Sequence, residues 1–219
     1  GTPLNDHVGL ISLKVTGTDS NGGVVSDIFD LTVVNTNDAP TASNRTLTTS
    51  EDSTKVLSTS DFGFSDVDTG NTLQSITITA LPIAGNLKLN GIAVTANQSI
   101  TVTDVTAGKL AFTPVANANG TGYASFGFKV SDGTALSSAA YAMTFNVTAV
   151  NDAPTLSTFA LPVTSGNEDN QITVSFANLQ TQGNEADIDG SVSAFVVKAV
   201  SAGTLKIGSS STTAAAWAA

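Results

Sequence analysis

The chain has 219 residues, a formal charge of −10 from 18 acidic and 8 basic residues, and no cysteine. The acidic balance argues against nucleic acid or an anionic membrane as a partner, because phosphate groups are bound by clustered Lys and Arg. The lack of cysteine excludes disulfides, thiol catalysis and Cys-ligated metals. Since the chain has one histidine, an all-oxygen site is the only multidentate metal site that its composition permits.

Apolar and polar residues alternate along most of the chain, which predicts strands with one buried face. The alternating apolar positions are Ile11/Leu13/Val15, Phe29/Leu31/Val33, Ile76/Ile78/Ala80, Ile100/Val102, Phe126/Phe128/Val130, Met143/Phe145/Val147 and Ile172/Val174/Phe176. Turn sequences such as Asn21-Gly22-Gly23 and Asn90-Gly91 separate these runs. About seven strands are expected in residues 41–150, which is typical of a β-sandwich.

No segment has a helical period of useful length. The best helical candidate is a single turn at Asp104–Lys109, in which Asp104 caps backbone amides. Asp61 is expected to form another local turn, and His7 is expected to have a structural role. The predicted fold class is therefore all-β.

A short motif recurs at domain-length spacing, which indicates tandem repeats. Asn37-Asp38-Ala39-Pro40-Thr41 returns as Asn151-Asp152-Ala153-Pro154-Thr155, 114 residues later. A strand-end aspartate precedes each copy, and Glu-Asp, Asp-x-Asp and Gly-x-Leu-Lys follow it. We expect residues 1–38 to be the C-terminal part of one repeat, 39–152 a complete repeat and 153–219 the N-terminal part of a third. The chain is thus expected to come from a longer protein.

The acidic residues are concentrated in these motifs, and clustered carboxylates repel one another unless a cation lies between them. Fourteen of the 18 lie in or next to a motif: Asp6, Asp19, Asp38, Glu51, Asp52, Asp66, Asp68, Asp132, Asp152, Glu168, Asp169, Glu185, Asp187 and Asp189. In an extended chain Asp66 and Asp68 point to the same side. Calcium binds six to eight oxygen ligands on a flexible frame, which suits such a cluster.

The strand ending in aspartate, followed by Val-x-Asn-Asp-Ala-Pro, resembles the cadherin-like tandem repeats of large bacterial surface and secreted proteins, including RTX-type adhesins. The segments 61–68 and 109–133 are similar to that class as well. The resemblance covers essentially the whole chain. It implies tandem Ig-like or cadherin-like Greek-key β-sandwich domains with calcium bound at their junctions.

Carried over residue by residue, the resemblance implies two sets of calcium ligands. The first set is Asp6, Asn37, Asp38, Asp66, Asp68 and Asp132, and the second is Glu51, Asn151, Asp152, Asp187 and Asp189. The sequence departs from the family pattern at Thr36 and Val150, where an aspartate-containing segment is usual, and at Ala39 and Ala153, where Asn is usual. The complete repeat also has Asn117 and Asn119 in place of a base aspartate. Fewer ligands imply one or two ions per junction.

The Glu-Asp pairs have two interpretations that the sequence leaves open. Glu51-Asp52 and Glu168-Asp169 either contribute to a calcium site or place charge on an edge strand, where it prevents sheet-to-sheet aggregation.

The expected function is that of a non-catalytic, calcium-binding segment of a bacterial surface or secreted protein, acting as a rigid extender or adhesion stalk. The expected partners are neighbouring repeats of the same chain, with cell-surface glycans or like repeats as further candidates and no direct membrane insertion. An enzyme is not expected, because the carboxylate pairs recur in every repeat whereas a catalytic pair occurs once. The alternative is a carbohydrate- or self-binding module, for which only Tyr123, Tyr141 and Trp217 offer an aromatic platform.

Overall fold

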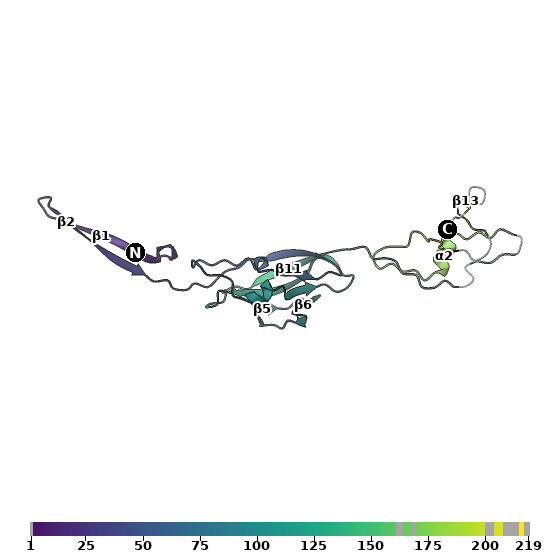
Figure 1. Cartoon of the computed structure of the whole chain (residues 1–219), viewed down its shortest axis with the longest axis horizontal. Helices are drawn as coiled ribbons and strands as arrows, with labels where there is room; N and C mark the ends of the chain where they lie inside the picture. The colour runs from purple at the N-terminus through teal and green to yellow at the C-terminus, as the bar shows by residue number, and fades with distance from the viewer. Residues whose placement is uncertain (1, 161–163, 168–169, 200–203, 208–214, 217–219) are drawn as a thin grey trace. The chain divides into compact units, whose positions relative to one another are not determined.

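The computed structural model describes residues 2–160, 164–167, 170–199, 204–207 and 215–216 (Figure 1). Its contacts divide the chain into two compact units, Gly1–Val150 and Asn151–Ala219. The described parts consist mainly of strands with a few short helices, so the predicted all-β class is confirmed. The repeat boundaries predicted at residues 38 and 152 stay predictions.

The chain begins with a hairpin. After the 3-10 turn η1 (Asn5–His7), strands β1 (Gly9–Thr18) and β2 (Val24–Val33) pair antiparallel, so the strands predicted from the alternation are present. The buried face predicted for them is wrong, since Leu13, Val15, Phe29 and Leu31 are between 39% and 57% exposed. The turn between them is closed by Asp19, whose Oδ1 accepts the backbone N–H groups of Asn21 and Gly23 at 2.9 and 2.7 Å. Nδ1 of His7 accepts the backbone N–H of Leu4 at 3.0 Å, which is a local structural role.

Two sheets form a sandwich between Thr41 and Val150. The strands are β3 (Arg45–Ser50), β4 (Lys55–Val56), β5 (Ser75–Ala80), β6 (Asn86–Leu89), β7 (Ile92–Ala93), β8 (Ser99–Thr101), β9 (Leu110–Thr113), β10 (Gly120–Ser131) and β11 (Tyr141–Thr148). One sheet has the order β3-β11-β10-β5-β8 and the other β4-β9-β6-β7. The structure thus has nine strands in this region where about seven were predicted. Strands β4 and β7 have two residues each, too few to show an alternation.

The sandwich is held together by aromatic and aliphatic side chains from both sheets. Phe112 of β9 stacks on Phe145 of β11, with ring centroids 3.9 Å apart and planes 8° from parallel. Phe62 packs edge-on against Phe128 of β10 at 5.1 Å. The alternating residues predicted for β5, β10 and β11 are buried, except that Ala80 is exposed at the end of β5. The buried face was therefore predictable from the period of two.

Parallel pairing of β3 with β11 sets the two ends of the sandwich. Their register runs from Arg45 opposite Met143 to Ser50 opposite Thr148. Since both strands run in the same direction, the residues that follow β3 lie beside those that follow β11. Strand β10 runs antiparallel to β11, so Asp132, which follows β10, lies at the opposite end.

Short helical turns are fixed by polar caps. Helix α1 (Val102–Thr106) begins two residues before the predicted turn, because Oγ1 of Thr101 accepts the N–H of Asp104 at 3.1 Å; Val102 is therefore helical and not part of a strand. The carboxylate of Asp104 also pairs with Nζ of Lys109 at 2.7 Å. The predicted turn at Asp61 is confirmed as η2 (Thr59–Phe62), where Oδ2 of Asp61 accepts the N–H of Ser58 at 2.7 Å.

The second unit contains a helix where a strand was predicted. Residues 171–175 have no regular structure and Phe176–Gln182 form helix α2, so the strand predicted over Ile172, Val174 and Phe176 is wrong. A capping box overrides the alternation: Oδ1 of Asn178 accepts the N–H of Ser175 at 2.9 Å, and Oγ of Ser175 accepts the N–H of Asn178 at 3.1 Å. Strands β12 (Lys206–Ile207) and β13 (Ala215–Ala216) form a short antiparallel pair.

No helix in the described ranges is both long and apolar enough to cross a membrane.

Replacing Phe112 by alanine is expected to destabilise the sandwich by about 3–5 kcal/mol, because it removes a fully buried ring and leaves a cavity against Phe145. Urea unfolding followed by circular dichroism measures this change. The control is Ile83→Ala, since Ile83 is 96% exposed and its truncation is expected to change stability by less than about 0.5 kcal/mol. Equal effects of the two substitutions would contradict the assigned core.

Candidate metal centre at the domain entry

A pair of backbone hydrogen bonds fixes the entry of the chain into the sandwich. The N–H of Thr41 donates to the carbonyl of Ser65 at 2.7 Å, and the N–H of Ser65 donates back at 2.9 Å. Pro40, which comes just before, is buried. This bridge holds the Asn37-Asp38 linker beside the segment that begins at Asp66.

Asp68 is the most confined acid of this cluster. Its side chain is 6% exposed, and its Oδ2 accepts the backbone N–H of Asp38 at 2.7 Å. Its Oδ1 is buried and has no hydrogen-bond partner. Because a buried, unpartnered carboxylate oxygen is costly, this atom marks a place where a cation would be stabilising. Oδ1 of Asp66 accepts the N–H of Asp68 at 2.9 Å, which holds the Asp66 carboxylate against the backbone of Asp68.

Asp132 completes the cluster from the end of β10. Nδ2 of Asn37 donates to Oδ2 of Asp132 at 3.0 Å. Oδ1 of Asp132 accepts the N–H groups of Thr134 and Ala135, both at 2.7 Å. The bond from Ala135 is the largest cause of a lowered pKa for Asp132; desolvation opposes it, and the bonds from Asn37 and Thr134 add to it. Asp132 is therefore more acidic in the folded protein than an unperturbed aspartate.

Asn71 belongs to the same cluster, although the sequence analysis missed it. Its Nδ2 lies 3.3 Å from Oδ1 of Asn37 and 3.4 Å from Oδ2 of Asp66. Its backbone N–H donates to the carbonyl of Asp68 at 3.2 Å. The Asp68-Thr69-Gly70-Asn71 turn was the signal that could have revealed it, because Asp, Gly and Asn favour a tight turn that brings the first and fourth residues together.

The linker itself is held by polar contacts. Nδ2 of Asn37 donates to the carbonyl of Asp38 at 2.8 Å, and Nδ2 of Asn5 donates to Oδ2 of Asp38 at 2.8 Å. Across the described residues, no three Asp, Glu or His side chains are arranged as ligands of one metal ion. The acids around the linker are bonded instead to amide groups of Asn5, Asn37 and Asn71.

The second unit repeats the entry geometry. Thr155 and Ala186 form the same bridge, with N–H to carbonyl distances of 2.8 and 3.0 Å. The N–H of Asp152 lies 3.3 Å from both carboxylate oxygens of Asp189, as that of Asp38 faces Asp68. Nδ2 of Asn151 donates to the carbonyl of Asp152 at 2.8 Å. The repeat motif thus predicts a recurring local structure.

Unpartnered carboxylate oxygens recur in this second cluster. Oδ1 of Asp187 and Oε2 of Glu185 are both buried without a hydrogen-bond partner. Glu185 was not predicted as a ligand, because the first repeat has Phe64 at the corresponding position. Its spacing of two residues from Asp187 was the available signal.

Glu51 is buried at the end of the sandwich opposite the Asn37-Asp38 linker. Its side chain is 2% exposed; Oε1 accepts the N–H of Val150 at 2.7 Å, and Oε2 accepts Nδ2 of Asn119 at 3.0 Å. Oδ1 of Asp52 accepts the N–H of Asn117 at 3.0 Å. Burial rules out the alternative that Glu51 shields an edge as an exposed charge, whereas a role in metal binding stays a prediction.

Three predicted positions lie outside what the structure describes. These are the side chain of Asp6 and the residues Glu168 and Asp169. Their metal-binding roles stay predictions. Trp217, the third candidate for an aromatic platform, also lies outside the described residues.

The tyrosines of the sandwich do not form an exposed platform. Tyr123 and Tyr141 are both partly buried against the core. Oη of Tyr123 accepts the N–H of Val115 at 3.1 Å. The aromatic surface that a sugar-binding interpretation requires is thus missing at these two residues.

Two sheets packed face to face, with acidic residues where the chain enters, define a β-sandwich module. A family model described as cadherin-like matches residues 40–149, which is half of the chain and contains the whole sandwich. The chain therefore belongs to the cadherin-like family. A comparison with curated proteins finds no match.

Two solved structures are similar at a low level. They are an endo-fucoidan hydrolase of glycoside hydrolase family 107, MfFcnA4, and a variant of the same enzyme. Their sequence identities are 22% and 23% respectively, and both have a TM-score of 0.33. Each match covers 74% of this chain, but the chain spans only 23% of the enzyme.

The lowered pKa of Asp132 predicts a pH-dependent contribution to stability. Because the folded pKa lies below the unfolded value of about 3.9, ionised Asp132 stabilises the fold above that pH and loses this effect as the pH falls through the folded pKa. The difference in melting temperature between the native chain and Asp132→Asn is expected to shrink below about pH 4. A difference that grows on acidification would contradict this assignment.

Replacing Glu51 by alanine is expected to cost about 1–3 kcal/mol, since it leaves the N–H of Val150 and the amide of Asn119 without their acceptors. Thermal unfolding provides the measurement. Glu51→Gln is the matched control, because its amide oxygen can still accept the Val150 bond. Full loss of stability in both variants would show that the charge, and not the hydrogen bonding, is essential.

Proposed function

We propose that this chain is a non-catalytic, calcium-binding segment of a large bacterial surface or secreted protein, in which calcium stiffens successive repeats into an extender or adhesion stalk. The observation that carries the proposal is the buried, unpartnered Oδ1 of Asp68, next to the carboxylate of Asp66 and the linker. Membership of the cadherin-like family supports an extracellular setting.

The donor set of the entry cluster suits calcium. Asp66, Asp68 and Asp132 supply carboxylate oxygens, while Asn37 and Asn71 supply amide oxygens once their side-chain amides rotate. Calcium accepts such mixed oxygen ligands in irregular geometry, whereas magnesium requires a near-ideal octahedron. Binding would replace the contacts that Asn37 and Asn71 now make with Asp132 and Asp66.

The second cluster strengthens the proposal because it is an independent copy. Asp187 and Glu185 also have buried oxygens without partners, and Asp152 also faces the second aspartate of the Asp-x-Asp motif. Acidic residues that only increase solubility have no reason to recur in the same buried arrangement. We assign the same ion-binding role to Asp187 and Asp189, with Asn151 and Asp152 as the linker and Glu185 as an additional ligand.

The mechanical consequence follows from electrostatics. Without a cation, the clustered carboxylates repel one another. The linker is then held by hydrogen bonds alone. With a cation, the linker residues and the domain share ligands, and the linker loses its freedom to bend. An affinity of roughly 10⁻⁴–10⁻³ M, typical of extracellular modules, would make this stiffening depend on external calcium.

No observation favours either alternative function, that of an enzyme or that of a carbohydrate- or self-binding module. The carboxylate pairs serve two successive linkers, which is unlike the single cleft of an enzyme, so a catalytic role is not proposed. Glycans and like repeats remain candidate partners for other parts of such a protein.

Calorimetric titration of the chain with calcium tests the proposal. We expect binding near millimolar and a rise in melting temperature. Asp66→Asn with Asp68→Asn is expected to remove one part of the heat, and Asp187→Asn with Asp189→Asn the other. The matched control is Asp27→Asn with Asp30→Asn, which removes the same charge from exposed positions on the hairpin.

Absence of heat and of any thermal shift in the unmodified chain would show that the acidic motifs serve only as turns. An equal loss of binding in the Asp27 and Asp30 control would show that general charge attracts calcium without a defined site.

A further inference from the structure

The first and last strands of the sandwich, β3 and β11, form a parallel pair. They are aligned over six residue pairs, from Arg45 opposite Met143 to Ser50 opposite Thr148. Strand β3 lies at the edge of its sheet, where β11 is the strand that holds it. The chain enters the sandwich just before β3 and leaves it just after β11. The ladder between these two strands therefore joins the entering segment directly to the leaving segment.

Tension along the chain loads this ladder in shear. A pull on the entering segment draws β3 toward its first residue, and a pull on the leaving segment draws β11 toward its last residue. Because the two strands are parallel, these pulls act in opposite directions along one axis. The hydrogen bonds of a parallel ladder are evenly spaced along the strands. Tension therefore strains them together, whereas a pull on one end of the pair would break them one after another.

Side chains extend the contact between the two strands at both ends of the ladder. Where the strands begin, Oδ1 of Asn44 accepts the backbone N–H of Ala142 at 2.8 Å. Where they end, the backbone N–H of Glu51 donates to the carbonyl of Thr148 at 2.9 Å. Oε1 of Glu51 also accepts the N–H of Val150 at 2.7 Å. The contact thus continues past the last ladder pair to the residue at which the chain leaves.

Burial and a second partner keep the Glu51 carboxylate in place. The side chain is 2% exposed, and Oε2 accepts Nδ2 of Asn119, just before β10, at 3.0 Å. Hydrogen bonds to charged groups are stronger than those between neutral groups, and burial protects them from competing water. A pull on Val150 is therefore passed through Glu51 to the end of β3 and to the segment that leads into β10.

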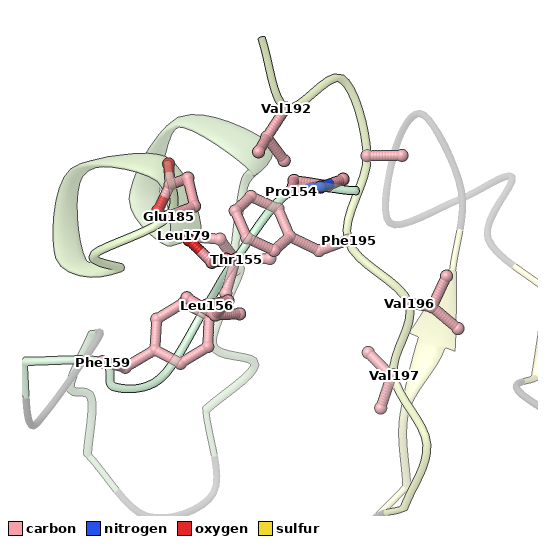
Figure 2. A pocket seen from close by; sticks show the side chains of 11 residues that line it. Pro154, Thr155, Leu156, Phe159, Leu179, Glu185, Val192, Phe195, Val196 and Val197 are labelled. Carbon is pink, nitrogen blue, oxygen red and sulfur yellow. The ribbon is translucent and has the colours of Figure 1, made fainter. Parts of the chain in front are cut away.

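The described residues of the second unit contain no parallel strand pair, since β12 and β13 are antiparallel. An apolar pocket of about 360 Å³ in this unit is lined by Phe159, Leu179 and Phe195 among others. Figure 2 shows Leu179 on a helix and Phe195 on a segment that forms no strand. Within the described residues, the parallel ladder of β3 and β11 is thus a property of the sandwich.

We propose that the sandwich is a force-bearing unit, in which the ladder of β3 and β11 resists tension as a shear clamp. The bond between Glu51 and Val150 is the latch at the exit end of this clamp. The proposal rests on the stalk function for the source of the tension, because a stalk is pulled along its chain. The latch needs no ion, since both oxygens of Glu51 have partners within the sandwich.

Stretching single molecules at constant force tests the clamp, and the lack of native cysteine allows handles at chosen exposed positions. Handles at Ala39→Cys and Ala153→Cys load the ladder in shear. Handles at Ala39→Cys and Ala140→Cys pull both strands from the end where they begin, so the pairs break one by one. At equal force, the sandwich is expected to survive about a hundredfold longer under the shear pull. Equal lifetimes would overturn the proposal.

The latch is tested by the direction of pull in which its loss matters. Glu51→Ala is expected to shorten the lifetime about tenfold under the shear pull. It is expected to leave the other lifetime nearly unchanged, because Glu51 lies at the far end of the ladder from both handles. The control is Leu87→Ala, which removes a buried side chain from the other sheet and is expected to shorten both lifetimes. Equal shortening of both lifetimes by Glu51→Ala would indicate general destabilisation and overturn the latch.

Val150→Pro provides a second variant, because it removes the donor N–H and leaves the Glu51 carboxylate in place. It is expected to shorten the lifetime under the shear pull as Glu51→Ala does, and a lifetime equal to that of the native chain would overturn the latch. All lifetimes are measured with a calcium chelator present. A failure of the calcium proposal would therefore leave them unchanged, and a failure of the clamp would leave the calcium titration unchanged.

Discussion

The parallel pairing of β3 with β11 is the constraint on which the arrangement of the molecule depends. It places the residues after the first strand of the sandwich beside those after its last strand. Glu51 is therefore buried against Val150 and Asn119, while Asp66, Asp68 and Asp132 gather at the other end with the entering linker. The core of stacked phenylalanines keeps these two polar ends apart. The pairing of β3 with β11 therefore determines which acidic residues lie where the chain leaves the sandwich and which lie where it enters.

The carboxylates at the two ends of the sandwich differ in their hydrogen bonding. Both oxygens of Glu51 accept hydrogen bonds, so that group is satisfied without any ion. Oδ1 of Asp68 has no partner, and the same is true of Oδ1 of Asp187 and Oε2 of Glu185. Buried polar atoms in folded proteins usually have partners. The unpartnered oxygens lie beside the two linkers that share the Asn-Asp-Ala-Pro sequence, which is why a cation is proposed at each linker.

The hairpin of β1 and β2 carries the inner face of two closing strands, and the second unit carries the capped turn and the linker bridge of an opening half. In the sandwich, Phe62 packs against Phe128 and Phe112 against Phe145, which joins segments that are far apart in the sequence. Hydrophobic burial is non-directional, whereas strand register and cap geometry are specific.

The sequence by itself determined the all-β class, the buried faces of β5, β10 and β11 and the pairing of each linker with an Asp-x-Asp motif, because a period of two and a repeated motif can be read without knowing the fold. It failed at Phe176, where the Ser175–Asn178 cap outweighs alternation, and at β4 and β7, which are too short to have a period. Only the tertiary structure decided that Asn71 joins the entry cluster, that Glu51 is buried and that Asp68 has an oxygen without a partner. These outcomes depend on which strands become neighbours, and residues as far apart as Glu51 and Val150 meet only after the sheet has formed.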